Sequence, residues 1–162
     1  MNLIDIKSPA DLKGLSLAEL TDLTALARQA LMTKVSEHGG HVGPPMGAAE
    51  MIMALHYVFN SPIDKIVYDV SHQSYVHKMV TGRALAFLDH DHYDDVTGYT
   101  DPTESEHDFF NIGHTSTSIS LASGLATARD LKGDSENIIA IIGDGSLSGG
   151  EAFEGLDYAA TL

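Results

Sequence analysis

The stretch at residues 138–150 reads IIAIIGDGSLSGG, and it indicates the fold class. Its first residues are apolar, as is typical of a parallel strand covered on both faces, and we expect that strand over residues 137–142. Small residues follow and lead into a predicted helix over residues 148–161. Asp144 lies between two glycines where the strand ends. A strand, a tight turn and a helix in this order are typical of an α/β protein.

The residues before this stretch alternate between helical and strand patterns. Ser16 and Glu19 form a capping box, which begins a helix whose apolar residues recur at helical spacing until Gly39-Gly40 ends it. Residues 90–110 show no periodicity, so we expect a functional or mobile loop there. Helices that alternate with strands predict an α/β fold with a parallel sheet. The other predicted elements are a buried helix over residues 46–59, a strand over residues 65–70, a helix over residues 73–81 that ends at Gly82, and a helix over residues 116–131 whose small residues allow close packing.

The composition excludes several classes of protein. The 162 residues are 43% hydrophobic and 20% charged, which is typical of one globular domain. No apolar run approaches the roughly 20 residues that span a bilayer, and the N-terminus lacks the pattern of a secretion signal. There are no cysteines, so disulfides and thiolate metal sites are excluded. Together these features predict a cytoplasmic protein with no membrane partner.

The net charge of −14 restricts the ligands. Nucleic acid binding needs clustered Lys and Arg, and only 9 such residues stand against 23 Asp and Glu, so no nucleic acid partner is expected. Residues 89–108 include eight acids and no Lys or Arg, which is typical of a solvated loop. His90 and His92 lie in this loop and are interpreted as surface residues rather than metal ligands. An anionic ligand must therefore bind through backbone N–H groups, a helix N-terminus or a metal ion.

Asp144 is the first candidate for a functional residue. Ligands of open parallel sheets bind beyond the carboxyl ends of the strands, which is where the predicted strand places Asp144. The flanking glycines allow a ligand to approach the backbone, and the next helix begins with free N–H groups. A carboxylate repels phosphates unless a cation lies between them, so Asp144, Mg²⁺ and a diphosphate form one consistent site. The alternative is a plain turn in which Asp144 caps the helix.

Histidines recur in motifs of the kind from which sites are built. His41 lies in GGHVG, His72 and His77 lie in DVSHQSYVH just past a predicted strand, and His114 lies in GHTSTS directly before a predicted helix. Each of them alone is more often structural than catalytic. Together they indicate a site, because glycine turns and strand ends commonly carry functional residues.

Four motifs stand in a recognisable order: GGHVG, DVSHQSYVHK, GHTSTS and GDGSLSGGEAFEGL. With these motifs in this order, the chain resembles the N-terminal part of the 1-deoxy-D-xylulose-5-phosphate synthase family. The members of that family are thiamine-diphosphate enzymes related to transketolase. The similarity includes SPADLKGLSLAEL and LATARDLKG and runs through nearly all of the 162 residues. It implies the doubly wound parallel sheet of the thiamine-diphosphate-binding fold, incomplete here. Residues 1–162 would form the N-terminal part of the diphosphate-binding domain, with later domains absent.

The resemblance also assigns roles to individual residues. It implies that thiamine diphosphate and Mg²⁺ are the cofactors. The implied roles are Asp144 as the Mg²⁺ ligand, Gly145 and Ser146 at the diphosphate, His72, His114, Thr115 and Ser116 along the cofactor pocket, and His41 facing the reacting centre, where it assists proton transfers.

The implied activity is that of a transferase. Pyruvate and glyceraldehyde 3-phosphate condense with loss of CO₂ to 1-deoxy-D-xylulose 5-phosphate, a precursor for isoprenoid and thiamine biosynthesis, in a full-length protein that is a homodimer. The chain alone is not expected to complete the reaction, because an asparagine that completes the metal site and a glutamate that activates the cofactor are expected beyond Leu162. The alternatives are a transketolase-like enzyme or split subunit with other substrates, and a domain that binds a diphosphate or a partner protein without catalysis.

Pro44-Pro45 departs from the family pattern, in which small or hydroxyl residues commonly follow the histidine motif. Two prolines fix φ and remove two N–H donors, so altered contacts near His41 are predicted. The acidic loop also lacks the basic residues that could meet a phosphorylated aldehyde.

Overall fold

The structure is a computed structural model that describes all 162 residues. The chain divides into two compact units, and each is described by itself. The first unit comprises Met1–Asn60 and His72–Gly98, and the second comprises Ser61–Ser71 and Tyr99–Leu162. None of the helices has both the length and the apolar character that a membrane crossing requires.

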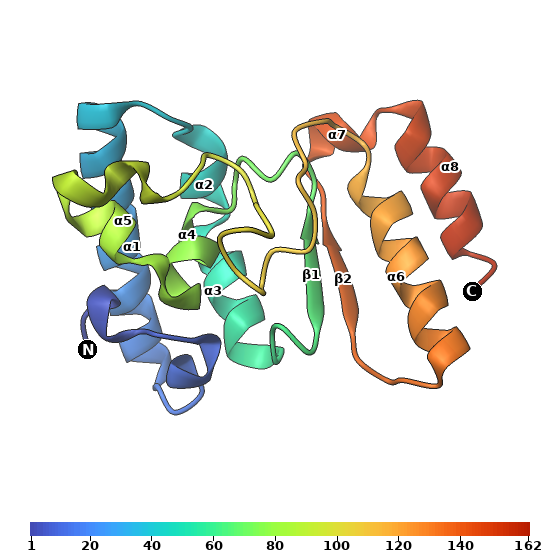
Figure 1. Ribbon diagram of the computed structural model, residues 1–162, viewed down its shortest axis with the longest axis horizontal. Coiled ribbons are helices and arrows are strands. Elements are labelled where there is room, and N and C mark those ends of the chain that lie inside the picture. The colour runs from blue at the N-terminus through green and yellow to red at the C-terminus, as the bar shows by residue number, and fades with distance from the viewer. The chain divides into compact units, whose positions relative to one another are not determined.

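The first unit is built from helices (Figure 1). The longest of them, α1, carries much of the core, and short helical segments surround it. The elements in chain order are the 3₁₀ helices η1 (Leu3–Asp5) and η2 (Pro9–Leu12), the α-helices α1 (Leu17–His38), α2 (Gly43–Gly47), α3 (Ala49–Val58) and α4 (Tyr75–Lys78), the π-helical turn η3 (Met79–Arg83), the helix α5 (Leu85–Leu88) and the 3₁₀ helix η4 (His90–Asp95).

Helix α1 begins and ends as predicted. The Ser16 hydroxyl accepts a hydrogen bond from the Glu19 amide at 3.3 Å, and the Glu19 carboxylate accepts one from the Ser16 amide at 2.8 Å, which completes the capping box. At the other end Gly39 has a φ of 89°, which terminates the helix. The apolar face predicted at helical spacing is confirmed for Leu20, Leu23, Ala27 and Leu31, which are buried, whereas Val35 at its end is only half-buried.

Lys34 is an unexpected member of that buried face, with 6% of its surface exposed. Its ammonium donates hydrogen bonds to the carbonyl oxygens of Ala86 at 2.9 Å and Tyr93 at 2.8 Å. It also lies 4.5 Å from the centre of the Phe87 ring, within the range of a cation–π contact. The buried charge is therefore compensated, and it ties α1 to α5 and η4.

The prediction of one buried helix over residues 46–59 is wrong in two respects. The helical segment is divided at Ala48 into α2 and α3, and α3 is buried on one face only, so that Met51 and Val58 are exposed. Pro44-Pro45 lies in the first turn of α2, where amide groups have no acceptor within the helix. The missing N–H donors of the two prolines therefore cost little, and their fixed φ suits a helix start.

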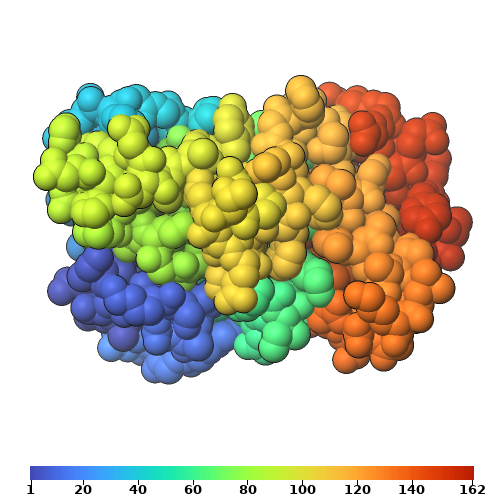
Figure 2. Space-filling model, viewed as in Figure 1, coloured from blue at the N-terminus to red at the C-terminus, as the bar shows by residue number.

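The remainder of the first unit follows the sequence pattern more closely. The helix predicted over residues 73–81 is shorter, and α4 passes into η3, where Gly82 has a φ of 90° and interrupts the helical backbone as predicted. Most of the acidic segment 89–98 is exposed and lies at the surface in Figure 2 (yellow-green). Within η4 the Asp95 carboxylate lies 2.7 Å from Nδ1 of His92 and raises the pKa of that histidine.

The second unit confirms the predicted parallel pairing. Strand β1 (Lys65–Tyr68) pairs in parallel with β2 (Ile138–Ile141), with Tyr68 opposite Ile141 at the carboxyl ends (Figure 1). The connection from β1 to β2 includes α4, η3, α5 and η4 and ends with helix α6 (Ser118–Lys132), which directly precedes β2 in the chain. Helices α7 (Asp144–Leu147) and α8 (Gly150–Ala159) follow β2. The expectation that β2 is covered on both faces is wrong for this chain: Ile141 is buried, but Ala140 is exposed.

Small residues bring α6 and α8 together, as the sequence predicted for α6. A Cβ added to Gly155 of α8 would lie 3.1 Å from the backbone nitrogen of Ser120 in α6. Ala122 and Ser123 of α6 are buried. The two helices lie side by side in Figure 1, and α6 lies next to β2.

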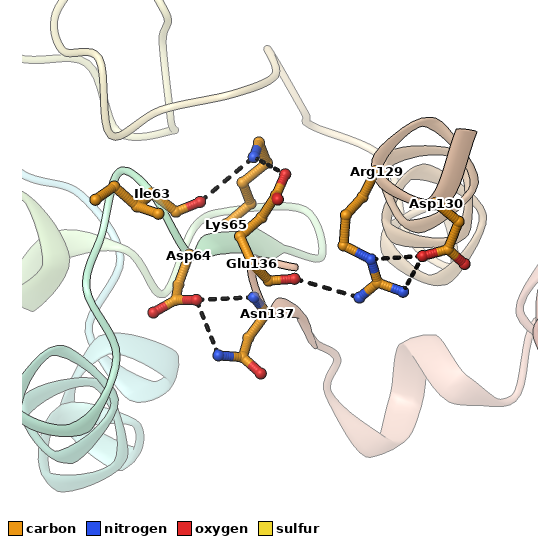
Figure 3. A network of polar contacts seen from close by, with 7 residues as sticks. All are labelled: Ile63, Asp64, Lys65, Arg129, Asp130, Glu136 and Asn137. Atoms are coloured by element: carbon orange, nitrogen blue, oxygen red, sulfur yellow. Dashed lines mark hydrogen bonds and ion pairs between the residues drawn. The ribbon is translucent and has the colours of Figure 1, made fainter. Parts of the chain in front are cut away.

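A polar network fixes the start of both strands (Figure 3). The Asp64 carboxylate accepts hydrogen bonds from the backbone N–H of Asn137 at 2.8 Å and from its side-chain amide at 2.9 Å. The Lys65 ammonium lies 2.6 Å from the Glu136 carboxylate and lowers the pKa of that group. Because both contacts join the start of β1 to the residues just before β2, they favour the observed register.

Candidate functional site

The predicted site residues divide between the two units. The first unit holds His41 and His72. The second unit holds the other predicted site residues, which are His114, Thr115, Ser116, Asp144, Gly145 and Ser146.

The first unit brings His41 and His72 together. Gly39 and Gly40 have φ values of 89° and 130°, and this left-handed segment carries the chain from α1 to His41. The rings of His41 and His72 meet edge to face, with 5.3 Å between their centres. Tyr75 completes the cluster, because its hydroxyl accepts a hydrogen bond from the His41 amide at 3.1 Å and lies 3.3 Å from Nδ1 of the same residue.

A cavity of about 260 Å³ borders this cluster. Its lining combines His41 and Tyr75 with Lys34, Phe87 and Thr97. The volume is slightly below the usual range of small-molecule pockets. The first unit can therefore place the His41 imidazole beside a small ligand.

His77, the other histidine of the DVSHQSYVH motif, is placed in the core. It is fully buried, as is His56, and Nδ1 of His77 lies 2.8 Å from Nε2 of His56. One ring must donate and the other accept in this contact. His77 is therefore a residue of the core rather than of the candidate site. The sequence pattern had not indicated His56 as its partner.

In the second unit the carboxyl end of β1 is organised by Asp69. Its carboxylate is 1% exposed and accepts hydrogen bonds from the backbone N–H groups of Ser116 at 3.0 Å and Ser118 at 2.9 Å. These groups stand at the N-terminus of α6, where a negative charge is favourable. Asp69 lay within a quoted motif without an assigned role. The strand was predicted over residues 65–70 and ends at Tyr68, and an acidic residue near the end of a buried strand was the available signal.

The chain leaves Asp69 through two residues in the left-handed region. Val70 has a φ of 58° and Ser71 a φ of 71°, and a branched side chain rarely adopts such a backbone. The buried Ser71 hydroxyl donates to the Ile112 carbonyl at 3.0 Å and accepts from the Thr100 amide at 3.0 Å. Backbone strain is therefore held in place by specific hydrogen bonds at this strand end.

Ser71 offers a direct measurement of that strain. Ser71→Ala and Ser71→Gly both remove the hydroxyl, but only glycine adopts a positive φ without cost. We expect both variants to be destabilised and Ser71→Gly to be the more stable by about 1 kcal/mol in urea unfolding. Equal stability of the two variants would contradict a strained Ser71.

Ser116 links the start of α6 to the turn after β2. It has a φ of 73°, and its hydroxyl donates to the Ser146 carbonyl at 2.7 Å. Its amide and its hydroxyl are thus both engaged within the unit. His114 and Thr115 directly before it are exposed, and His114 borders a cavity of about 320 Å³ with Thr117 and Glu151.

Asp144 is the first residue of α7, and its side chain is exposed and its carboxylate makes no hydrogen bond or ion pair within the chain. The N-cap position belongs to Gly143, so the structure does not support the alternative in which Asp144 caps the helix. A Cβ on Gly143 or Gly145 would meet nothing within 4 Å. The two glycines therefore leave open space beside Asp144, and a ligand can approach the backbone of this turn.

A single carboxylate at Asp144 is compatible with a hard divalent cation such as Mg²⁺. The chain contains no cluster of three His, Asp or Glu side chains that could enclose a metal. A cation at Asp144 must therefore take most of its ligands from elsewhere. Mg²⁺ accepts this arrangement, because it commonly binds one or two carboxylates, water and phosphate oxygens.

These strand ends define a class of protein: an α/β chain with a candidate ligand site beyond the carboxyl ends of parallel strands. The sequence matches the 1-deoxy-D-xylulose-5-phosphate synthase family over residues 3–162, and the chain belongs to that family. The resemblance found in the motifs is thereby confirmed.

Individual relatives agree with this assignment. The chain is 52% identical to the 1-deoxy-D-xylulose-5-phosphate synthase of Symbiobacterium thermophilum, over 98% of this chain and 24% of the relative. It is 53% identical to that of Caldanaerobacter subterraneus, over 94% of this chain and 24% of the relative. It is 52% identical to that of Shouchella clausii, over 98% of this chain and 25% of the relative. The chain thus spans about a quarter of the length of these curated relatives.

Proposed function

We propose that residues 1–162 are the N-terminal part of a thiamine-diphosphate-binding domain. The enzyme would condense pyruvate with glyceraldehyde 3-phosphate, with loss of CO₂, to 1-deoxy-D-xylulose 5-phosphate. The family match supports this activity. The structural observation that carries the proposal is the free carboxylate of Asp144, in a turn that the Ser116 hydroxyl ties to the start of α6.

In this proposal the second unit holds the diphosphate. Asp144 binds Mg²⁺, and Gly145 and Ser146 contact the diphosphate. His114 and Thr115 line the cofactor pocket, and Ser116, which the resemblance also places there, contributes by holding the turn through Ser146. The bound cofactor supplies the electron sink for carbon–carbon bond formation, and the protein supplies position and a shielded site.

The charge distribution explains why a metal ion is needed. Two N–H groups at the N-terminus of α6 already bind the Asp69 carboxylate, whose negative charge opposes a phosphate at this helix end. The net charge of −14 opposes the approach of an anion. A divalent cation at Asp144 offsets both effects, because it neutralises phosphate oxygens directly.

The first unit contributes the residues that face the reacting centre. His41 is proposed to act there on the substrate, and His72 to line the cofactor pocket. The wider proposal includes a doubly wound sheet, of which β1 and β2 are two strands, a homodimer of the full-length protein and a cytoplasmic location.

Titration with thiamine diphosphate tests the metal role of Asp144. We expect binding that requires Mg²⁺ and that Asp144→Ala weakens by about tenfold or more, as for the loss of one charged contact. Isothermal titration calorimetry with and without EDTA makes the measurement. Asp157→Ala is the matched control, because it removes another exposed carboxylate of the same unit. Equal affinity in Asp144→Ala and in the unchanged chain would rule out the proposed metal role.

The substrates need a separate measurement on the protein expressed from its gene. Release of CO₂ from pyruvate should rise when glyceraldehyde 3-phosphate is added. Transfer of a two-carbon unit from a ketose phosphate without CO₂ release would favour the transketolase-like alternative. Binding of the cofactor with neither reaction would favour a non-catalytic domain.

A further inference from the structure

We infer that Asp69 is a positioning residue for the turn that carries Asp144 (residues 143–149), and that it acts on this turn through Ser116. In this inference Asp69 touches neither the metal ion nor the diphosphate. The order of the turn is a property of the second unit alone. Its meaning for metal binding rests on the function proposed above.

The first link joins Asp69 to the backbone of Ser116. One oxygen of the buried Asp69 carboxylate accepts from the Ser116 amide at 3.0 Å, and the other accepts from the Ser118 amide at 2.9 Å. A hydrogen bond to an ionised carboxylate is about twice as strong as one between neutral groups. Ser116 has a φ of 73°, a backbone conformation that persists where specific contacts hold it. Asp69 therefore fixes the position from which the Ser116 side chain extends.

The second link joins that side chain to the turn. The Ser116 hydroxyl donates to the Ser146 carbonyl at 2.7 Å, and Ser116 is 6% exposed, so water has little access to the donor. The side chain is also closely packed, because a Cβ on Gly149 would lie 2.9 Å from the Cβ of Ser116. A shift of Ser116 would therefore be felt directly by the turn.

The other hydrogen bonds of the turn are local. The Leu147 amide donates to the Gly143 carbonyl at 2.9 Å, and the Gly149 amide donates to the Ser146 carbonyl at 3.1 Å. Such bonds close the turn on itself and do not anchor it. The bond from Ser116, 30 positions away from Ser146, is the one that ties the turn to the end of β1.

This path gives Asp69 an indirect effect on the affinity for a metal ion. A carboxylate on an ordered turn binds without a further loss of conformational entropy, whereas a loosened turn must first be ordered. Loss of either link should therefore weaken metal binding at Asp144. Ser116→Ala is the cleaner variant for this effect, because it changes no charge.

Amide hydrogen exchange of the chain without cofactor tests both links. The Leu147 and Gly149 amides report on the turn, and the amides of β2 report on the unit as a whole. Relative to β2, we expect exchange at the two turn amides to rise about tenfold in Ser116→Ala and severalfold in Asp69→Asn. Asp69→Asn keeps the size of the side chain and one acceptor oxygen but removes the charge. The double variant should exchange no faster than Ser116→Ala alone, because Asp69 acts through the Ser116 hydroxyl.

Ser135→Ala is the matched control, since it removes an exposed hydroxyl of the same unit and should leave the exchange of the turn unchanged. Unaltered exchange of the turn in Ser116→Ala would overturn the inference by itself, whether or not Asp69→Asn folds. Unaltered exchange in a folded Asp69→Asn, or effects that multiply in the double variant, would overturn the role of Asp69.

Calorimetry with Mg²⁺ and thiamine diphosphate measures the consequence for binding. We expect the affinity to fall severalfold in Ser116→Ala and to stay unchanged in Ser135→Ala. Equal affinity in Ser116→Ala and in the unchanged chain would overturn the effect on the metal site. If the unchanged chain binds no thiamine diphosphate, the proposed function fails, and the exchange measurement still decides whether Asp69 positions the turn.

Discussion

Replacing Asp69 by alanine is expected to lower the free energy of unfolding by about 3–5 kcal/mol, with the loss concentrated in α6. The Asp69 carboxylate accepts two backbone hydrogen bonds at the N-terminus of this helix and is almost completely buried. Its removal leaves the amides of Ser116 and Ser118 without acceptors, and it removes a negative charge from a helix N-terminus. Urea unfolding followed by circular dichroism gives the total loss, and amide hydrogen exchange shows whether α6 opens first.

Two further variants separate capping from a general effect of losing an acid. Asp69→Asn keeps one carbonyl oxygen as an acceptor, so it should lose less stability than Asp69→Ala. Asp134→Ala removes an exposed carboxylate from the same unit and should change the stability by less than about 0.5 kcal/mol. If Asp69→Ala unfolds at the same urea concentration as the unchanged chain, the carboxylate does not stabilise the start of α6.

The parts of the fold that the sequence predicted well are those determined by neighbouring residues. The capping box at Ser16 and Glu19, the glycine that ends α1 and the two apolar strands all depend on chemistry within a few positions. The parallel pairing of β1 and β2 was predicted as well, because strands that alternate with helices are typical of a parallel sheet.

The contacts that escaped prediction join segments that lie far apart in the sequence. Lys34 has the charge of a surface residue, yet carbonyl groups 52 and 59 positions away bind its ammonium. Asp69 binds amides 47 and 49 positions away. No local pattern encodes such partners, because each needs the backbone path of another segment.

The burial of helix faces shows the same limit. An apolar pattern over residues 46–59 predicted a buried helix, but Ala48 interrupts it, and Met51 and Val58 are exposed. The apolar composition of β2 likewise predicted two covered faces, whereas Ala140 is exposed. Periodicity indicates which residues can be buried, and only neighbouring elements determine which of them are.

The roles of the candidate site residues stay predictions, and the contacts that support these residues could not be predicted from the sequence. His41 and His72 were expected together, and the first unit brings their rings into contact. Tyr75 lies in the same motif as His72, but a tyrosine within an apolar pattern is more often a core residue than a partner of a histidine. Ser116 was expected at the cofactor, yet its hydroxyl binds the Ser146 carbonyl.

Gly149→Ala is expected to cause the second large loss of stability, because residue 149 lies against the Ser116 side chain that binds Ser146. A Cβ on Gly149 would collide with the Ser116 hydroxyl and would lie 2.9 Å from the Cβ of Ser116. The hydroxyl cannot turn away without losing its hydrogen bond to Ser146, which lies in α7 beside Asp144. We expect a loss of about 2–4 kcal/mol in urea unfolding, from overpacking, the lost hydrogen bond and a poorer N-cap for α8.

A second substitution at Ser116 should reverse most of this loss. Ser116→Gly removes the hydroxyl that collides with Ala at 149, and glycine tolerates the φ of 73° found there. The double variant Gly149→Ala/Ser116→Gly should therefore be more stable than Gly149→Ala alone, although Ser116→Gly by itself gives up a hydrogen bond. The double variant would then lose less stability than the sum of the two single losses, which is expected only if the two side chains collide. Additive losses in the double variant would show that residue 149 does not pack against the Ser116 side chain.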